Sequence, residues 1–482
     1  MTAPEHVDVL VIGAGLSGIG AAARLAQEHP RRSYAVLEAR AASGGTWDLF
    51  RYPGIRSDSD MFTMGYRFRP WRSSTALADG PSILRYVRET AREFGVDRHI
   101  RYRHEVTAAA WNSEEARWTV TARTPDGEVE LTAGFLWACS GYYDYDEPYR
   151  PELPGVERYA GRLVHPQHWP EDLDTTGQRV VVIGSGATAI TLVPSLARDG
   201  AAQVTMLQRS PTYVLALPGV DPVARVLRRW LPERLSYWAT RWKNVGVSVA
   251  TFQVSRRWPG FARAAIRKAA ARQLPAGFPV DVHFRPTYDP WDQRLCLVPD
   301  GDLFRAIREG KVDVVTDTID TFTEKGVRVS SGDELVADVV VTATGFNLKI
   351  MGGMDLVVDG RPVRLEQKMA YRGLMFDGVP NFAFTIGYTN ASWTLKADLV
   401  ADYVCRLLHH LDEHGHRSAV PVRDPGVGEA PFMDFTPGYV QRSLDRLPHQ
   451  GDREPWRLRQ NYFHDVRAIR HSRIDDGVLR FR

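Results

Sequence analysis

Two glycine-rich turns, at residues 13–18 and 184–189, constrain the fold of this chain more than any other feature. In both, a short apolar run leads into the turn and a helical pattern follows it. This order of strand, glycine-rich turn and helix is typical of a unit that binds a dinucleotide. Because 482 residues are too many for a single hydrophobic core, we expect an α/β fold with two Rossmann-like dinucleotide-binding domains.

The first turn reads Gly13-Ala-Gly15-Leu-Ser-Gly18, and the strand after its helix ends in Glu38. Gly13 permits the tight turn, Gly15 lets the backbone approach a pyrophosphate, and Gly18 lets the helix pack closely on the strand. A carboxylate at Glu38 can accept hydrogen bonds from ribose hydroxyl groups but would repel a 2′-phosphate. The first unit therefore predicts a site for FAD or NAD. The alternative is an ordinary turn between a strand and a helix.

The second turn reads Gly184-Ser-Gly186-Ala-Thr-Ala189, with alanine in place of the third glycine. The strand that follows its helix leads to Arg209, where the first unit has Glu38. A guanidinium can bind a 2′-phosphate through two hydrogen bonds. This contrast assigns FAD to the first unit and NADPH to the second. The alternative for Arg209 is a surface arginine without a ligand.

Two further motifs surround these turns. The first has Gly45 and Trp47 in a Gly-Gly-Thr-Trp sequence and reaches Asp58 after a Tyr-Pro-Gly turn. Glycines there allow the backbone to lie against a cofactor, although Asp58 could simply close a turn. The second runs over residues 159–170, with Tyr159, Gly161, His165, Trp169 and Pro170 as its recurring positions. Its prolines and aromatics suit a stiff connector between two domains, and the alternative is an ordinary inter-domain strand.

Residues 222–272 differ from the rest of the chain in charge. They contain twelve lysines or arginines and one acid, Glu233, with four tryptophans between them. The pattern predicts a helical insert at about 222–290 in the second domain. We favour a subdomain that covers the active site with its charges in solvent. A basic amphipathic helix that lies on an anionic membrane surface is the second interpretation.

Composition excludes several functions. The net charge of +3 favours no nucleic-acid partner. We find neither a secretory signal pattern nor an apolar run of about 18 residues. We therefore expect a cytoplasmic protein, whose only contact with a membrane would be a peripheral one at the membrane surface. Asp144, Asp146 and Glu147 alternate with tyrosines, which we interpret as a solvated loop, and we predict no metal site. The sequence indicates no particular oligomeric state.

The motifs at residues 44–58 and 159–170 resemble the signatures of the Baeyer–Villiger monooxygenases, with Tyr159 in place of the usual phenylalanine, and the resemblance extends over nearly the whole chain. It implies that Asp58 lies by the flavin and orients an essential arginine, which Arg294 matches. Many members have lysine just before that arginine, so Gln293 leaves more of the 2′-phosphate contact to Arg209. The helix that opens near Trp393 is expected to point at the flavin.

The resemblance also implies a reaction. NADPH would reduce FAD, O2 would form a flavin C4a-peroxide, and the peroxide would convert a ketone to an ester or lactone, or a sulfide to a sulfoxide. Arg294, held by Asp58, would favour the deprotonated peroxide, whereas His165 would couple nicotinamide binding to domain position. Two alternatives remain: a flavin-containing monooxygenase that oxygenates only nitrogen or sulfur, and an NADPH oxidase or reductase that oxygenates nothing.

We expect three segments along the chain. Residues 1–148 would begin the FAD-binding domain, residues 149–340 would hold the connector and the NADPH-binding domain, and residues 341–482 would complete the FAD-binding domain.

Overall fold

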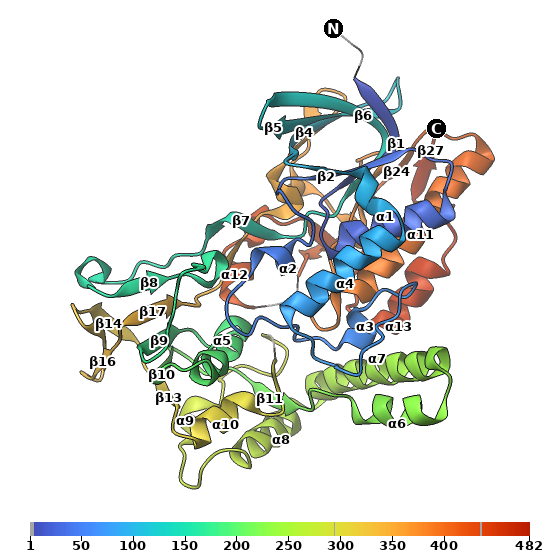
Figure 1. The fold of residues 1–482 in the computed structure, drawn as a ribbon. Coiled ribbons are helices and arrows are strands. Elements are labelled where there is room, and N and C mark those ends of the chain that lie inside the picture. The colour runs from blue at the N-terminus through green and yellow to red at the C-terminus, as the bar shows by residue number, and fades with distance from the viewer. Residues whose placement is uncertain (1–3, 294, 434–435) are drawn as a thin grey trace.

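The computed structural model describes residues 4–293, 295–433 and 436–482. It confirms the α/β class. Two separate sheets are built on parallel strands, and in each sheet one strand leads into a glycine-rich turn. A helical arm extends beneath the two sheets (Figure 1). Arg294 lies outside the described residues.

The first sheet has nine strands in the order β20-β19-β4-β5-β6-β1-β2-β3, with β23 paired to β6. Parallel pairing joins β1 to β2 and β6, and antiparallel pairing joins β4, β5 and β6. The strands are β1 (Glu5–Ile12), β2 (Tyr34–Glu38), β3 (Ile100–Tyr102), β4 (Glu105–Asn112), β5 (Arg117–Thr124), β6 (Gly127–Ala138), β19 (Asp355–Val358), β20 (Arg361–Pro362) and β23 (Phe382–Phe384). Three of them, β19, β20 and β23, come from the C-terminal part of the chain. The first sheet is therefore completed by residues that follow the whole second sheet in the sequence.

Side chains of β1 alternate between two cores, as the period of a strand requires. Val9 and Val11 face a helical layer, whereas Leu10 and Ile12 face a second core under the antiparallel strands. The helical layer consists of α1 (Leu16–Glu28), α4 (Gly80–Glu93) and α11 (Trp393–His414), with the short helices α2 (Thr46–Leu49) and α3 (Met61–Met64) beside it (Figure 1). This layering fixes the start of α1 at the carboxyl ends of β1 and β2.

The second sheet is entirely parallel, in the order β13-β10-β9-β17-β8. Its strands are β8 (Arg162–Val164), β9 (Arg179–Ile183), β10 (Gln203–Gln208), β13 (Val312–Thr316) and β17 (Val339–Thr342), and its helices are α5 (Ala187–Arg198) and α10 (Asp302–Arg308). A small antiparallel sheet of β14 (Ile319–Phe322), β15 (Gly326–Val329) and β16 (Glu334–Val336) lies alongside.

The two sheets are joined by an antiparallel pair of strands, β7 (Tyr143–Pro148) and β18 (Phe346–Leu348). Residues 143–148 are therefore a strand, so our prediction of a loop there is wrong, although Asp146 and Glu147 are exposed to solvent as expected. The connector motif lies further along, where β8 forms the edge of the second sheet. It belongs to that sheet because β8 pairs with β17, and Tyr159 Oη donates to the carbonyl oxygen of Ala337, just before β17, at 3.0 Å.

The helical arm consists of α6 (Pro222–Trp230), α7 (Glu233–Arg257) and α8 (Pro259–Ala271), followed by α9 (Val280–His283). It leaves the second unit between β11 (Val214–Leu217) and β12 (Cys296–Pro299), which pair in parallel. Figure 1 shows α7 running beneath α3, so the arm reaches across to the first unit.

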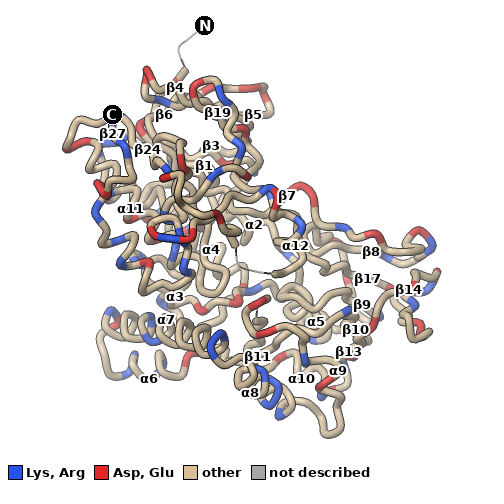
Figure 2. Tube along the Cα trace, turned by 180° about the vertical axis from the view of Figure 1, so that it is seen from behind, with Lys and Arg blue, Asp and Glu red and all other residues tan. Residues whose placement is uncertain are grey.

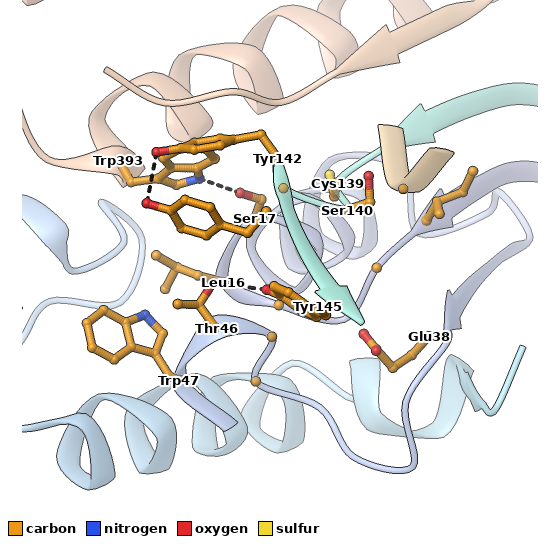
Figure 3. Close-up of a pocket in the computed structure, with 18 of the residues that line it drawn as sticks. Leu16, Ser17, Glu38, Thr46, Trp47, Cys139, Ser140, Tyr142, Tyr145 and Trp393 are labelled. Atoms are coloured by element: carbon orange, nitrogen blue, oxygen red, sulfur yellow. Dashed lines mark hydrogen bonds between the residues drawn. The ribbon is translucent and has the colours of Figure 1, made fainter. Parts of the chain in front are cut away.

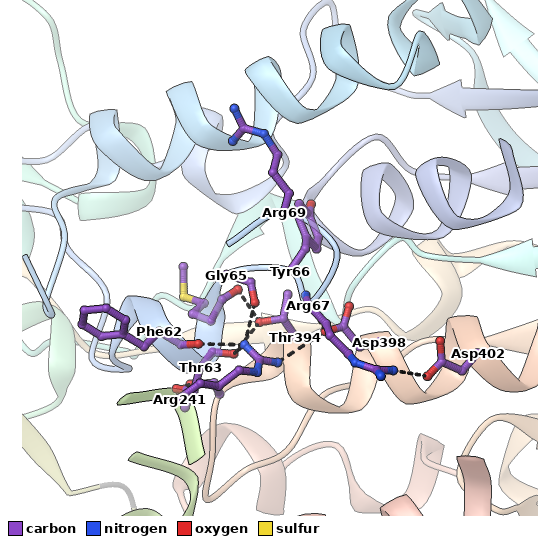
Figure 4. A network of polar contacts seen from close by, with 12 residues as sticks. Phe62, Thr63, Gly65, Tyr66, Arg67, Arg69, Arg241, Thr394, Asp398 and Asp402 are labelled. Atoms are coloured by element: carbon purple, nitrogen blue, oxygen red, sulfur yellow. Dashed lines mark hydrogen bonds and ion pairs between the residues drawn. The ribbon is translucent and has the colours of Figure 1, made fainter. Parts of the chain in front are cut away.

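A buried arginine on α7 fixes this crossing (Figure 4). Arg241 Nη1 donates to the backbone carbonyls of Phe62 at 2.7 Å and Gly65 at 2.9 Å. Its Nη2 lies 3.4 Å from an oxygen of Asp398 on α11. Since all these groups are buried, Arg241 supplies donors to backbone carbonyls of the α3 region, and Tyr237 Oη adds one to Phe62 at 3.2 Å.

The remaining elements pack near the C-terminus and the second core. They are β21 (Ala370–Tyr371), β22 (Met375–Phe376), β24 (Ala419–Pro421), β25 (Glu429–Pro431), β26 (His449–Gly451), β27 (Leu479–Phe481), α12 (Gly438–Gln441) and α13 (Tyr462–Asp465). In the part of the chain that the structure describes, each helix is too short or too polar to traverse a lipid bilayer.

Candidate functional site

A cavity of about 420 Å³ opens at the carboxyl ends of β1 and β2 (Figure 3). Seven of the residues singled out from the sequence line it: Gly13, Gly15, Glu38, Gly45, Trp47, Asp58 and Trp393. They come from four separate stretches of chain, which the fold brings to one site. Gly18 does not line the cavity; it packs against the backbone of Gly13, which does.

The first turn has the geometry that its glycines predict. Gly13 has a φ of +98°, and a Cβ added there would lie 2.8 Å from the carbonyl oxygen of Cys139. A Cβ at Gly18 would lie 1.8 Å from the carbonyl oxygen of Gly13, so α1 packs against its own turn. Gly15 faces Gly45 across the cavity floor, with an added Cβ only 3.5 Å from the Gly45 Cα. Two bare backbones therefore form the floor of the cavity.

Glu38 is buried beside this turn and is held by backbone amides. Its carboxylate accepts from the Ala14 amide at 2.7 Å and from the Arg40 amide at 3.0 Å. Burial raises the pKa of Glu38, and the two amides oppose that rise. The carboxylate lies along the cavity wall. Each of its oxygens accepts one of these bonds and can accept a further hydrogen bond from a ligand.

An arginine network lies next to Glu38. Arg40 donates to the Gly45 carbonyl at 3.1 Å and pairs with the buried Asp48 at 2.8 Å. Arg88 of α4 pairs with the same carboxylate at 2.7 Å. These pairs lock the loop that carries Gly45 and Trp47 onto the helical layer.

Aromatic side chains form the opposite wall, where Tyr142 and Tyr145, which were not expected from the sequence, join Trp393 (Figure 3). Trp393 donates from Nε1 to Ser17 Oγ at 2.7 Å and lies 5.3 Å from the Tyr142 ring between centroids. Tyr145 and Thr46 share a hydrogen bond of 2.9 Å between their hydroxyl oxygens, and burial raises the pKa of Tyr145 to about 12. The alternation of Tyr143, Asp144, Tyr145 and Asp146 at period two was the available signal for this wall.

One polar atom of the cavity is left without a protein partner. Ser140 Oγ is buried, lines the cavity, and makes no hydrogen bond to any described residue. A buried hydroxyl without a partner carries a free-energy cost that a bound ligand can remove. The cavity therefore fits a polar ligand that approaches the bare backbone of the first turn.

The stretch from Gly45 to Asp58 touches both units. Tyr52 and Ile55 are buried in the core of the second unit, and a Cβ added at Gly54 would lie 1.8 Å from Ser195 Oγ on α5. Arg56 pairs with Asp302 of α10 at 2.5 Å. The chain then returns, so that Asp58 lines the cavity of the first unit. This stretch is a structural bridge whose two ends face the first cavity.

The second turn repeats the first at the carboxyl end of β9. Gly184 has a φ of +136°, and an added Cβ would lie 2.3 Å from the Ala343 carbonyl oxygen. Ala189 is fully buried under the turn, whereas Gly186 has open space before it. Arg209 is exposed after β10, and none of the ion pairs among the described residues involves it. These four residues do not line the first cavity.

The connector motif is packed against the second sheet, away from the cavity lining. The side chain of His165 is buried and accepts from the Gln167 amide at Nδ1, at 3.1 Å. Burial lowers the pKa of His165 to about 4, with help from the positive charges of His168 and Arg150. Gly161 packs against the Asp338 carbonyl, and Trp169, followed by Pro170, packs on the core of the second unit. His165 is thus a neutral histidine at neutral pH.

Known proteins resemble this chain in sequence over its full length. A family described as flavin-binding monooxygenase-like matches residues 76–225, and a family described as NAD(P)-binding Rossmann-like domain matches residues 11–76. The FAD-containing monooxygenase EthA of Mycobacterium tuberculosis is 57% identical over 479 residues, which cover 99% of this chain and 98% of that protein. The chain belongs to the FAD-containing monooxygenases.

Two other members of this family show how broad the likeness is. The putative FAD-containing monooxygenase MymA of Mycobacterium tuberculosis is 51% identical over 485 residues, covering 99% of this chain and 98% of that one. The probable FAD-binding monooxygenase AlmA of Acinetobacter baylyi is 46% identical over 481 residues, covering 99% of this chain and 96% of that one.

Solved structures share the arrangement of the FAD-containing monooxygenase fold described above. An oxidized steroid monooxygenase bound to NADP has a TM-score of 0.73 and 25% identity, covering 86% of this chain and 88% of that one. Cyclohexanone monooxygenase from Rhodococcus, bound to NADP+, has a TM-score of 0.70 and 21% identity, with 87% of each chain covered. The latter likeness supports the fold alone.

Proposed function

We propose that this FAD-containing monooxygenase catalyses Baeyer–Villiger oxidation, using FAD, NADPH and O2 to convert ketones to esters or lactones, and that it also oxidises sulfides. The observation that carries the proposal is the bridge from Gly45 to Asp58, which runs from the first cavity into the core of the second unit and back. A Baeyer–Villiger signature lies on that bridge.

The chain offers distinct groups to each cofactor. FAD would lie with its pyrophosphate over the bare backbone of Gly13, Gly15 and Gly45, its ribose at Glu38, and the aromatic wall of Trp393 beside it. NADPH would lie at the second turn, where Gly186 leaves open space and the exposed Arg209 can bind the 2′-phosphate. The names of the family's members support FAD as one of the two cofactors.

Bound FAD, once reduced by NADPH, supplies the activated oxygen that is transferred to the substrate. The protein's part is to exclude water and to fix charge at the reacting atoms. Asp58 lines the cavity, and the family resemblance gives it the role of orienting the cation of Arg294. His165, buried and neutral beside the second sheet, is assigned a positioning role rather than proton transfer.

The test is a panel of linear, cyclic and aryl ketones plus sulfides, with NADPH under air. We expect ester or lactone from at least one ketone class. In Arg294→Ala ester formation should disappear while NADPH oxidation continues, and Asp58→Asn should lower ester yield with less effect on NADPH oxidation. Ester formation that survives the loss of Arg294 contradicts the catalytic assignment.

Two other functions predict different results in the same panel. An enzyme limited to nitrogen and sulfur would give sulfoxide and no ester from any ketone. An oxidase or reductase would consume NADPH without any oxygenated product. The ratio of product formed to NADPH consumed therefore separates all three.

We also propose domain limits of 1–148, 149–340 and 341–482. The five strands of the second sheet all lie between residues 162 and 342, and the paired strands β7 and β18 lie at the two junctions. Limited proteolysis that releases a fragment spanning about 149–340 would support these limits, and cleavage inside the second sheet would contradict them.

A further inference from the structure

The short helix α6 has its apolar side turned outward. Val223, Val226 and Trp230 recur at the i, i+3 and i+7 spacing of one helix face, and Trp230 is 77% exposed. The opposite side carries Ala224, which is fully buried against Phe62 and its neighbours. An amphipathic helix normally buries its apolar stripe, so this exposed stripe needs a partner outside the chain.

The apolar surface continues around the corner into α7. Leu231 is exposed in the turn, and Leu235 is 58% exposed on the first turn of α7. We call these residues the outer arm face: Val223, Val226, Trp230, Leu231 and Leu235. Single exposed apolar residues are ordinary on proteins, but a contiguous group marks an interaction surface.

Basic residues recur along the helices that carry the outer arm face, α6 and α7, and along α8 (Figure 2). Residues 222–272 have twelve basic side chains and one acid, Glu233. Some of the basic groups pair with carboxylates elsewhere, such as Lys243 with Asp221 and Arg267 with Asp281. Six others are exposed, and no ion pair among the described residues involves them: Arg225, Arg229, Arg234, Arg257, Lys268 and Arg272.

We propose that the outer arm face docks on the surface of an anionic phospholipid bilayer. Tryptophan and leucine suit the boundary between headgroups and acyl chains, and arginines beside them suit lipid phosphates. Arg225 and Arg229 lie on the same helix as Trp230, so the apolar and cationic contacts are side by side. A protein interface would instead deplete charge at its centre. This docking is independent of the proposed function, since it needs no substrate.

The arm is tied to the first unit by hydrogen bonds. Its α7 is tied by Arg241 to the backbone of residues 62–65, next to the bridge that ends in Asp58. Docking would therefore hold the first unit with one fixed side facing the lipid.

The test is flotation of the purified flavin-loaded protein with vesicles of phosphatidylcholine alone and of phosphatidylcholine mixed with phosphatidylglycerol. We expect binding to the anionic vesicles only, and weaker binding at high salt. Trp230→Ser with Leu235→Ser should abolish it. Arg225→Glu with Arg229→Glu should reduce it by roughly 20-fold or more, at about fivefold for each cation. The matched control is Arg361→Glu with Arg364→Glu, on and beside β20, which pairs with β19 at the end of the molecule opposite α6 (Figure 2).

Several outcomes would overturn the proposal. One is native protein that stays unbound with anionic vesicles at low salt. Another is equal loss of binding in the arm and control charge variants, which would mean general electrostatics. A third is native protein that does not bind vesicles but changes its oligomeric state when Trp230→Ser is introduced, as measured by sedimentation, which would make a second copy of the chain the occupant. Retained flavin absorbance shows that each variant is folded, and vesicle binding without NADPH keeps this test separate from catalysis.

Discussion

Arg241 Nη2 lies 3.4 Å from Asp398 Oδ2, and this buried pair joins the helical arm to α11 of the first unit (Figure 4). Burial raises the pKa of Asp398 to about 6, and the guanidinium opposes that rise. The carboxylate also accepts from the Arg67 amide at 3.0 Å. The pair thus connects three segments that are remote in sequence.

Replacing Arg241 with methionine should destabilise the protein strongly. The change leaves Asp398 buried without its cation and the Gly65 carbonyl without its arginine donor, while the Phe62 carbonyl keeps only the bond from the Tyr237 hydroxyl. We expect a loss of about 3–5 kcal/mol in the free energy of unfolding, measured by urea denaturation. Adding Asp398→Leu should recover part of the loss, because the unpaired charge is removed. A single variant as stable as the native protein would contradict the role of this pair.

The two glycine-rich turns allow a matched pair of substitutions. Gly15 and Gly186 both precede a helix with φ near −80° and −76°, so alanine fits the backbone at either position. In Gly15→Ala the methyl group fills the space over Gly45, and we expect protein that purifies with little flavin, read from its visible absorbance. In Gly186→Ala flavin should be retained while the KM for NADPH rises. If both variants lose flavin equally, the assignment of one cofactor to each turn is wrong.

Arg209→Gln should change the choice of nicotinamide cofactor. Loss of a charge-assisted contact to the 2′-phosphate should raise the KM for NADPH by roughly 10–100-fold. The KM for NADH should remain the same, because NADH has no phosphate there. Steady-state kinetics with both cofactors measures this. Arg198→Gln, at the far end of α5, is the control and should alter neither value.

His165 should make stability depend on pH. Its folded pKa of about 4 lies below the ordinary value, so the neutral form is stabilised. That contribution is complete above about pH 6.5 and is lost as pH falls toward 4. Between pH 7 and pH 5 the native protein should lose about 2 kcal/mol from this source. In His165→Asn, which keeps an acceptor for the Gln167 amide, that loss should be absent. Equal pH profiles for the two proteins would refute the burial argument, since every other titrating group is shared.

Local features of the site could be predicted from the sequence. The turn at Gly13 and the acid at Glu38 follow from short stretches, because a strand, a turn and a helix fix each other over a few residues. The second turn was predictable for the same reason.

Other features depend on contacts between distant segments. The aromatic wall forms because β7 pairs with β18 and because Trp393 reaches Ser17, and neither pairing leaves a local pattern. Arg241 lies in a run of basic residues, where composition indicates solvent, yet it is the buried member of that run. On α6 the spacing identifies an apolar face but cannot tell whether that face is covered.

The order of strands in the first sheet has a consequence for how the chain emerges from the ribosome. All strands of the second sheet have been synthesised by Thr342, whereas the first sheet still lacks β19, β20 and β23, and α1 still lacks its neighbour α11. The later unit can therefore mature first, while the earlier one waits with apolar surface uncovered. A nascent chain stalled before Trp393 should be the form most in need of a chaperone.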